Sequence, residues 1–169
     1  MVSQDKLVWD DNERSAVYKI TEAACATQSL PEFYHRVFTI LKDVLRIDNF
    51  FIALYDEKTD LITFPCYIDE MEPAVPEPHR PGRGLTEYVL RTGRHILVTP
   101  KTFADMLRSG EVELVGADGV DWIGVPLTVA GKAIGVMSVQ TYSRTDRLST
   151  GELRFLDFVS AQISMVIAQ

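Results

Sequence analysis

The sequence has few cysteines, no long apolar run and no excess of basic residues, and each shortage excludes a class of function. Its 169 residues include only two cysteines, Cys25 and Cys66, without the CxxC or Cys/His spacing of a zinc site or a redox pair. We therefore expect two free, buried thiols. No apolar run approaches the roughly 20 residues that span a bilayer, and the N-terminus lacks the pattern of a signal peptide. The sequence predicts a cytoplasmic protein that does not insert into a membrane.

Basic residues are outnumbered by acidic ones. The chain has 17 Lys and Arg against 24 Asp and Glu, which gives a formal net charge of −7. A nucleic-acid-binding surface needs a basic face to neutralise phosphates, so we expect no nucleic-acid partner. Hydrophobic residues make up 46% of the chain, and a domain of this size hides roughly 70% of its unfolded surface. We expect a lead-in at 1–14 and one domain at 15–169.

Helical patterns stand at both ends of the chain. Ser29 and Glu32 have the spacing of a capping box, and apolar residues then recur at helical intervals until about Arg46. A weaker helix precedes it, around residues 17–27. A second capping box begins at Ser149 and opens a C-terminal helix that is still apolar where the chain stops. We expect that helix to continue into a coiled coil or a following domain.

Strand patterns fill the middle of the chain. The stretches NFFIALYD (49–56) and LITFPCYI (61–68) predict a hairpin, in which Pro65 favours an edge strand or a bulge. A second hairpin, at 121–142, is apolar on both faces and turns at Ala130 and Gly131. Between the hairpins lie a proline-rich loop at 69–84, two short helices and a short strand, HILVT. This order predicts an α+β fold whose mainly antiparallel sheet is covered on both faces.

Three segments carry a resemblance to a known family: WIGVPL (122–127), GKAIGVMSVQ (131–140) and LRFLDFVSAQISMVI (153–167), supported by GLTEYVLRTGR (84–94). In order and spacing they resemble the GAF family of small sensory domains, which occurs in sensor histidine kinases, diguanylate cyclases and phytochromes. The resemblance implies a GAF/PAS-like (profilin-like) sheet of about six strands. It also implies terminal helices on one face, which often dimerise, and a lid with short helices over a small-molecule pocket on the other.

The sequence departs from the GAF branches whose ligands are known. Bilin-binding members attach the chromophore through a lid cysteine, commonly followed by His, whereas Cys66 lies in a predicted strand and precedes Tyr67. The Asn-Lys pair of many cyclic-nucleotide binders does not occur. Free methionine sulfoxide reductases use several pocket cysteines, and only Cys66 lies nearby. We expect neither a covalent bilin nor a cyclic nucleotide, and the cofactor is left unassigned.

Eight residues on the elements around the expected pocket are candidate ligand contacts, although the same residues would also suit an ordinary core. Arg83 stands just before a predicted helix N-terminus, where backbone amides favour an anion, so an anionic ligand is one hypothesis. Ordinary solvation or pairing of Arg83 with the acidic loop is the alternative. The eight candidates are Phe64, Cys66, Tyr67, Arg83, Tyr88, Phe103, Met106 and Trp122.

No arrangement of catalytic or metal-binding residues is readable in the sequence. The three histidines, His35, His79 and His95, are scattered over a helix, the loop and a strand, so we expect no metal site. Haem ligation by His79 or His95 stays open as a minor alternative. No Ser/His/Asp or Cys/His arrangement is readable. We therefore expect this domain to lack enzymatic activity.

The C-terminal helix carries a second functional expectation. Leu153, Leu156, Ile163 and Ile167 follow heptad spacing and are candidate contacts of a homodimer. The leading hypothesis is a sensory GAF domain that binds an unknown small molecule and signals through dimer helices in a bacterial signalling protein. One alternative is a structural dimerisation module without a ligand. The other is an enzyme of the free methionine sulfoxide reductase type that uses Cys66.

Overall fold

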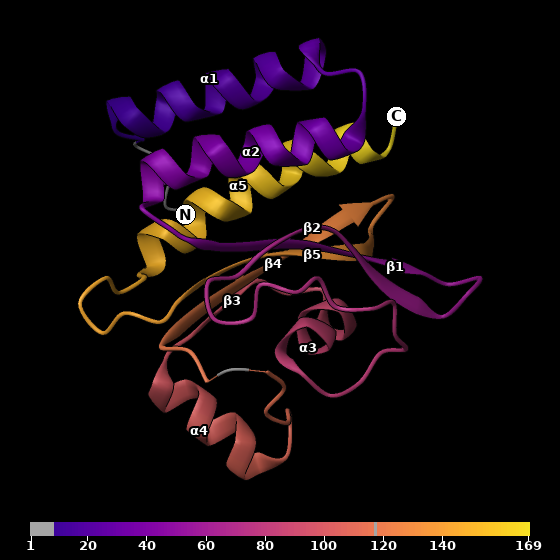
Figure 1. Ribbon diagram of the computed structural model, residues 1–169, viewed down its shortest axis with the longest axis vertical. Helices are drawn as coiled ribbons and strands as arrows, with labels where there is room; N and C mark the ends of the chain where they lie inside the picture. Colours follow the sequence, from indigo (N-terminus) through magenta and orange to yellow (C-terminus); the bar gives the residue numbers. More distant parts are fainter. Residues whose placement is uncertain (1–8, 117) are drawn as a thin grey trace, which may run out of the picture.

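Helices cover both faces of one sheet. The computed structural model describes residues 9–116 and 118–169. Three helices, α1 (Asp11–Ala26), α2 (Leu30–Leu45) and α5 (Thr150–Ile167), lie on one face, with α1 outermost (Figure 1). The short helices α3 (Leu85–Thr92) and α4 (Pro100–Ser109) lie on the other face with the long loops. Among the described residues, no helix has the length and apolar character needed to cross a membrane.

The sheet has five antiparallel strands among the described residues. They are β1 (Asn49–Asp56), β2 (Leu61–Ile68), β3 (Ile96–Val98), β4 (Asp121–Val129) and β5 (Lys132–Thr141), in the order β2-β1-β5-β4-β3. The α+β fold is confirmed, with one strand fewer than the six or so expected. The loop at 69–84 runs beside β2 but forms only the bridge between Ile62 and His79. Its prolines lack the N–H that a continuous ladder needs, and they are Pro73, Pro76, Pro78 and Pro81.

Pro65 has the two features predicted for it. Strand β2 lies at the edge of the sheet, and its pairing with β1 changes register between Ile52 and Leu54, opposite Pro65. An edge position and a bulge both remove the need for a ladder hydrogen bond from this residue.

The β4–β5 hairpin is buried on both faces. Its turn residues Ala130 and Gly131 have φ angles of 52° and 78°, as a two-residue type I′ turn requires. Ile123, Val125 and Leu127 belong to the core under the terminal helices. Trp122 and Val136 belong to a second cluster under α3 and α4. The two-sided apolar pattern of this hairpin therefore reflects two separate cores.

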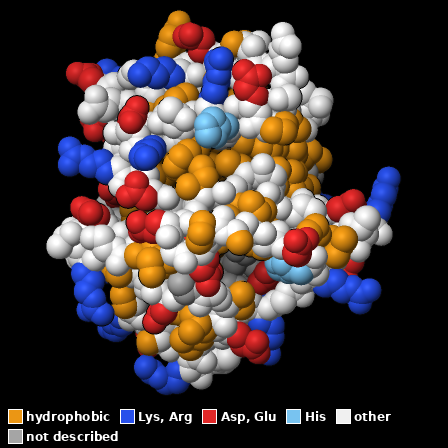
Figure 2. Space-filling view, viewed as in Figure 1, with side chains coloured by type: hydrophobic (Ala, Val, Ile, Leu, Met, Phe, Trp, Pro, Cys, Tyr) orange, Lys and Arg blue, Asp and Glu red, His pale blue; other side chains and the backbone are white. Residues whose placement is uncertain are grey.

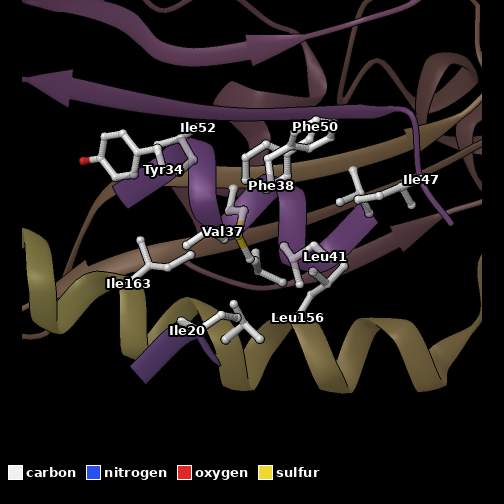
Figure 3. Close-up of a cluster of buried hydrophobic side chains, with 14 of the residues drawn as sticks. Ile20, Tyr34, Val37, Phe38, Leu41, Ile47, Phe50, Ile52, Leu156 and Ile163 are labelled. Carbon is white, nitrogen blue, oxygen red and sulfur yellow. The ribbon is translucent and has the colours of Figure 1, made fainter. Parts of the chain in front are cut away.

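The larger core lies between the sheet and the terminal helices. Figure 3 shows side chains of α1, α2 and α5 converging on those of β1, and the labelled side chains are Ile20, Tyr34, Val37, Phe38, Leu41, Ile47, Phe50, Ile52, Leu156 and Ile163. Full burial of one such aliphatic or aromatic side chain contributes about 1.5–3 kcal/mol. This core fixes α2 and α5 against the sheet and leaves α1 as an outer layer.

The predicted helix caps are present. Ser29 Oγ accepts a hydrogen bond from Glu32 N at the start of α2, and Ser149 and Glu152 form a capping box at the start of α5. Helix α1 begins at Asp11 with its own capping box, formed by Asp10 and Glu13. It thus begins within the segment 1–14 that was expected to be a lead-in, of which residues 1–8 lie outside the described residues.

An ion pair between a buried carboxylate and a half-exposed guanidinium joins the start of β4 to the segment before α5. Asp121 is 0% exposed, and its carboxylate accepts hydrogen bonds from Arg147 Nε at 2.7 Å, Arg147 Nη2 at 2.9 Å and Leu148 N at 2.9 Å. Burial alone would raise the pKa of Asp121, but the hydrogen bonds from Arg147 and Leu148 outweigh it and lower this pKa. The ionised carboxylate therefore stabilises the fold.

We predict that Asp121→Asn lowers the free energy of unfolding by about 2 kcal/mol, because charged hydrogen bonds to a buried carboxylate are lost. The matched control is Glu57→Gln, which removes the exposed Glu57–Lys132 pair and should cost less than about 0.5 kcal/mol. Urea denaturation of both variants checks this, and equal losses would contradict it. The folded pKa of Asp121 is depressed, so the difference between wild type and Asp121→Asn should shrink as pH falls below about 4.

Candidate functional site

A cavity of about 210 Å³ lies between the second face of the sheet and the loops that carry α3 and α4. Its floor comes from β1, β2, β4 and β5, and its walls from the loop at 69–84, residues 113–116 and 118–120, and the start of α3. The lining residues are Phe51, Phe64, Tyr67, Asp69, Glu72, Pro76, His79, Gly84, Leu85, Thr86, Glu87, Val98, Phe103, Glu113, Leu114, Val115, Gly116, Asp118, Gly119, Val120, Trp122, Gln140 and Tyr142.

Aromatic rings form one side of the cavity. Phe51, Phe64 and Tyr67 contact one another, with ring centroids 5.5–6.0 Å apart. The bulge at Pro65 interrupts the alternation along β2 and so brings Phe64 and Tyr67 to the same face, where β1 contributes Phe51 beside them. His79 packs on Phe64 at 5.8 Å from the loop above. Trp122 supplies a further ring from β4, on the far side of β5.

Gly124 makes room for the Trp122 ring. A Cβ atom built at Gly124 would collide with the ring of Trp122 and come within 2.9 Å of Val89 in α3. Any larger residue at this position would therefore displace the Trp122 ring from its place on the sheet.

The cavity wall carries five carboxylates and, in the described part of the chain, neither Lys nor Arg. Asp69 accepts a hydrogen bond from Tyr142 Oη at 2.8 Å, and Glu87, which is 9% exposed, accepts one from Gly84 N at 2.6 Å. The carboxylates belong to Asp69, Glu72, Glu87, Glu113 and Asp118. Figure 2 shows acidic and hydrophobic side chains intermixed over the lower half of the molecule, with Lys and Arg mainly near its edges.

Two tyrosines in the lining respond to these charges. Burial, with Asp69 and Glu72 as further causes, raises the pKa of Tyr67 above its ordinary value. Burial, the hydrogen bond to Asp69 and the nearby carboxylates likewise raise the pKa of Tyr142. Both hydroxyls are therefore protonated at neutral pH, and the site combines neutral donors with negative carboxylates.

Four of the eight predicted contacts line the cavity: Phe64, Tyr67, Phe103 and Trp122. Tyr88 and Met106 belong to the cluster on the same side of the sheet but are not in the lining. Instead, the Arg91 guanidinium lies over the Tyr88 ring, with its Cζ atom 5.6 Å from the ring centroid. An apolar side chain on an element beside the cavity can therefore either line the cavity or pack in the core behind it.

Arg83 also lies outside the lining. Its Nη2 donates a hydrogen bond to Gly110 O, and its own carbonyl oxygen accepts one from Glu113 N at 2.7 Å. Arg83 therefore fastens the loop after α4 to the segment before α3. The N-terminus of α3, where an anion was expected, already holds the carboxylate of Glu87.

Cys66 lies on the opposite face of the sheet. It pairs with Ile52 and packs against the larger core, so the prediction that it belongs with Phe64 and Tyr67 is wrong. The bulge at Pro65 shifts the alternation, and Cys66 then faces α2 while Tyr67 faces the cavity. Burial raises the pKa of the Cys66 thiol to about 11. Cys25 is exposed on α1, contrary to the expectation of two buried thiols.

The predicted dimer contacts need a similar correction. Leu156 and Ile163 are 1% and 0% exposed, because the heptad stripe that they mark packs on the domain's own sheet and helices. They are therefore unable to contact a partner, and Leu153 and Ile167 are half-buried against the same core. On the three helices of this face, the exposed large apolar residues are Tyr18 on α1, Leu30 on α2, and Phe158 and Met165 on α5.

Sequence reasoning missed the polar half of the cavity. Its carboxylates come mainly from loops, where acidic residues are normally solvated, and nothing in the sequence indicates which of them turn inward. One signal was available: Glu87 stands three residues after Gly84 at a predicted helix start, which is capping spacing. His79 lies at the cavity rim, whereas His95 pairs with Asp157 on the surface.

A family model described as "GAF domain" matches residues 27–168. The chain belongs to the GAF domain family. The GAF fold thus explains the order of elements, the two terminal helical segments and the covered second face of the sheet. A search of curated proteins finds no significant match.

Solved structures support the same fold at low sequence identity. The GAF domain of an Acinetobacter phosphoenolpyruvate-protein phosphotransferase is 20% identical with a TM-score of 0.74, over 95% of both chains. The A. Aeolicus nlh2 GAF domain in an inactive state is 16% identical with a TM-score of 0.69, over 92% of this chain and 95% of that one. A free methionine-R-sulfoxide reductase from Neisseria meningitidis, bound to its substrate, is 15% identical with a TM-score of 0.74, over 94% and 91% of the chains.

The geometry of the two cysteines predicts different reactivities. The thiolate is the reactive form, so Cys66, with a pKa of about 11, should react slowly with a thiol reagent at neutral pH. Labelling of Cys25→Ser, which retains only Cys66, should accelerate as pH rises toward that pKa, whereas Cys66→Ser should label promptly through Cys25. Rapid labelling of Cys66 at neutral pH would contradict the prediction and favour an enzyme.

Proposed function

We propose that this GAF domain is a non-catalytic sensory domain that binds a small molecule under its lid and signals through its terminal helices. We place it in the cytoplasm, as part of a bacterial signalling protein such as a sensor histidine kinase or a diguanylate cyclase. The observation that carries the proposal is a cavity, lined by apolar rings and a few polar groups, whose lining strand β4 is hydrogen-bonded through Asp121 to the segment just before α5.

Ligand binding is supported by how the lid is held. The segment after α4 covers the cavity and is fastened to the segment before α3 by the two hydrogen bonds at Arg83. Val120 N also donates a hydrogen bond to Thr141 O at 2.8 Å, at the end of this segment. A ligand that contacts both the lid and the floor would favour one lid arrangement, and its effect is limited by its difference in affinity between arrangements.

The path to α5 is short. Trp122 lines the cavity, and the preceding residue, Asp121, holds Arg147 and Leu148 next to the N-cap Ser149 of α5. Near its other end, α5 contacts β4 again, where Ser164 Oγ accepts a hydrogen bond from Thr128 N. A ligand-dependent shift of Trp122 therefore acts on a strand that is bonded to the signalling helix at two points.

Homodimerisation is proposed through the exposed side of the helical layer. Phe158 and Met165 are seven residues apart on α5, as in a heptad seam, and Ala161 lies between them. Met165 is 68% exposed and Tyr18 on α1 is 69% exposed. An apolar stripe of this kind suits a partner helix better than it suits water.

A non-catalytic role is supported by the position of the cysteines. Cys66 faces the larger core and Cys25 lies on α1, so neither sulfur reaches the cavity. A reductase mechanism requires a thiol beside the bound sulfoxide, and this cavity lacks one among its described lining residues. The structural similarity to methionine sulfoxide reductases therefore extends to the fold alone.

We predict that native mass spectrometry of the freshly purified protein shows extra, non-covalent mass that disappears on denaturation. Thr86→Phe, which places a ring in the cavity, should abolish that mass, whereas the control Thr92→Phe, at the other end of α3 and outside the lining, should retain it. A polypeptide-only mass in all three proteins would favour a dimerisation module without a ligand.

We also predict that Met165→Glu weakens dimerisation by at least about tenfold in dissociation constant, because a charge is desolvated in the interface. Sedimentation at several concentrations checks this. The control is Lys101→Glu on α4, which lies at the opposite end of the molecule from the terminal helices (Figure 1). If the wild type is a monomer, or if both variants dimerise with equal affinity, the proposed interface is wrong.

A further inference from the structure

The charge of the cavity points to the chemical class of its ligand. We propose that the cavity binds a small organic ammonium ion, whose positive charge lies among the carboxylates and whose apolar body lies on the aromatic rings. This proposal rests on the proposed ligand-binding function and specifies it further. It replaces the hypothesis of an anionic ligand, which was drawn from Arg83 and the helix start.

The carboxylates of the lining have no cationic partners among the described residues. Each ion pair found in this part of the chain lies elsewhere, and none involves Asp69, Glu72, Glu87, Glu113 or Asp118. Glu87 is buried and Asp69 half-buried, whereas Glu72, Glu113 and Asp118 are exposed around the opening, and together these negative charges disfavour an anion. A cation that enters the space is instead attracted to them.

One of these carboxylates is deeply buried. Glu87 is 9% exposed, and its described partner is a backbone amide, Gly84 N at 2.6 Å. A buried carboxylate normally has a cation or several hydrogen-bond donors around it. The remaining lone pairs of Glu87, in the cavity wall, are suited to accept hydrogen bonds from an ammonium group.

The rings favour the same charge. Six aromatic side chains line the cavity: Phe51, Phe64, Tyr67, Phe103, Trp122 and Tyr142. The face of an aromatic ring attracts a cation within about 6 Å of its centroid, most strongly when the cation is desolvated. Rings and carboxylates together select a group that is both positive and partly apolar, which is the character of a protonated amine.

A second polar feature lies on the same face of the sheet. Ser138 on β5 pairs with Phe51 on one side and with Gly124 on the other. Its Oγ is buried and has no hydrogen-bond partner in the described residues. A buried hydroxyl without a partner is uncommon. Ser138 lies in the sheet next to the lining residue Phe51 but is not itself in the cavity lining, so this hydroxyl belongs to the layer behind the site.

A metal ion fits these residues less well than an organic cation. In the described part of the chain, no three His, Cys, Asp or Glu side chains are grouped closely enough to hold a metal ion. Calcium, for comparison, takes about 6–8 oxygen ligands at about 2.3–2.6 Å. The carboxylates here are spread over the wall, so they suit an extended cation. The volume of about 210 Å³ corresponds to about seven waters at about 30 Å³ each, which limits the ligand to a small molecule.

The test compares probes that differ in charge but little in shape: phenethylamine, 2-phenylethanol and hydrocinnamate, with choline as a second cation. Binding to the intact chain is measured at neutral pH by calorimetry, and by tryptophan fluorescence in a Trp9→Phe variant, in which Trp122 is the remaining tryptophan. We expect phenethylamine to bind at least about tenfold more tightly than the neutral and anionic probes, a difference of about 1.4 kcal/mol.

Two variants keep shape and change charge. Glu87→Gln retains an oxygen that can accept the hydrogen bond from Gly84 N, and Asp69→Asn retains one for Tyr142. Each should weaken phenethylamine binding by about tenfold, while leaving 2-phenylethanol unaffected. Glu22→Gln, on the exposed side of α1, is the matched control for loss of one negative charge and should change neither.

Each result of these binding measurements supports or overturns the proposal of an ammonium ligand. Tighter binding of hydrocinnamate or 2-phenylethanol than of phenethylamine, or equal loss in Glu22→Gln and Glu87→Gln, would overturn the ammonium proposal. So would a failure of both phenethylamine and choline to bind at millimolar concentration. The proposed sensory function fails separately, through a polypeptide-only native mass that Thr86→Phe does not alter.

Discussion

Burial of the β4–β5 hairpin on both faces is the constraint on which the rest of the structure depends. A sheet whose central strands are apolar on both sides must be covered twice, so the chain needs a layer of helices on each face. The terminal helices provide one cover and form a close-packed core with Ile123, Val125 and Leu127. The second cover, with α3 and α4, is smaller and leaves a cavity. The two covers therefore differ: one is close-packed, and the other leaves the cavity.

The two sides are connected through the strands that they share. Trp122 faces the cavity and Ile123 faces the helices, one residue apart on β4. At the start of the same strand, the carboxylate of Asp121 accepts hydrogen bonds from Arg147 and Leu148, which lie just before α5. A displacement of β4 at the cavity therefore reaches α5 without crossing a flexible linker. This arrangement gives a sensory role a physical route, which a fold assignment alone does not provide.

The lining of the cavity in this GAF domain is acidic. Arg83 and its neighbours suggest a basic site when they are read along the chain, yet the fold uses Arg83 to fasten a loop and encloses Asp69 and Glu87. The pocket is thus acidic, whereas the sequence around Arg83 suggests a basic site. Function within this family depends on what fills the pocket, so the sign of its charge separates ligand classes more sharply than overall similarity does.

The sequence by itself determined the elements and their order. Hydrophobic periodicity and capping boxes predicted α2 and α5, the apolar stretches at 49–56 and 61–68 predicted β1 and β2 with their bounds, and Pro65 indicated an edge strand or a bulge. These features depend on neighbours within a few positions along the chain, which is the range that a sequence pattern records.

Only the tertiary structure decided which side chains face which core. The bulge at Pro65 turned Cys66 away from the cavity, packing placed Leu156 and Ile163 inside the domain, and loop closure brought Asp69, Glu87 and Asp118 to one wall. Each outcome depends on contacts between residues far apart in the chain, or on a local shift of register that reverses every following side chain. The sequence therefore determined the family and its framework, whereas the charge of the cavity and the exposed surface of α5 were set by the packing of distant segments.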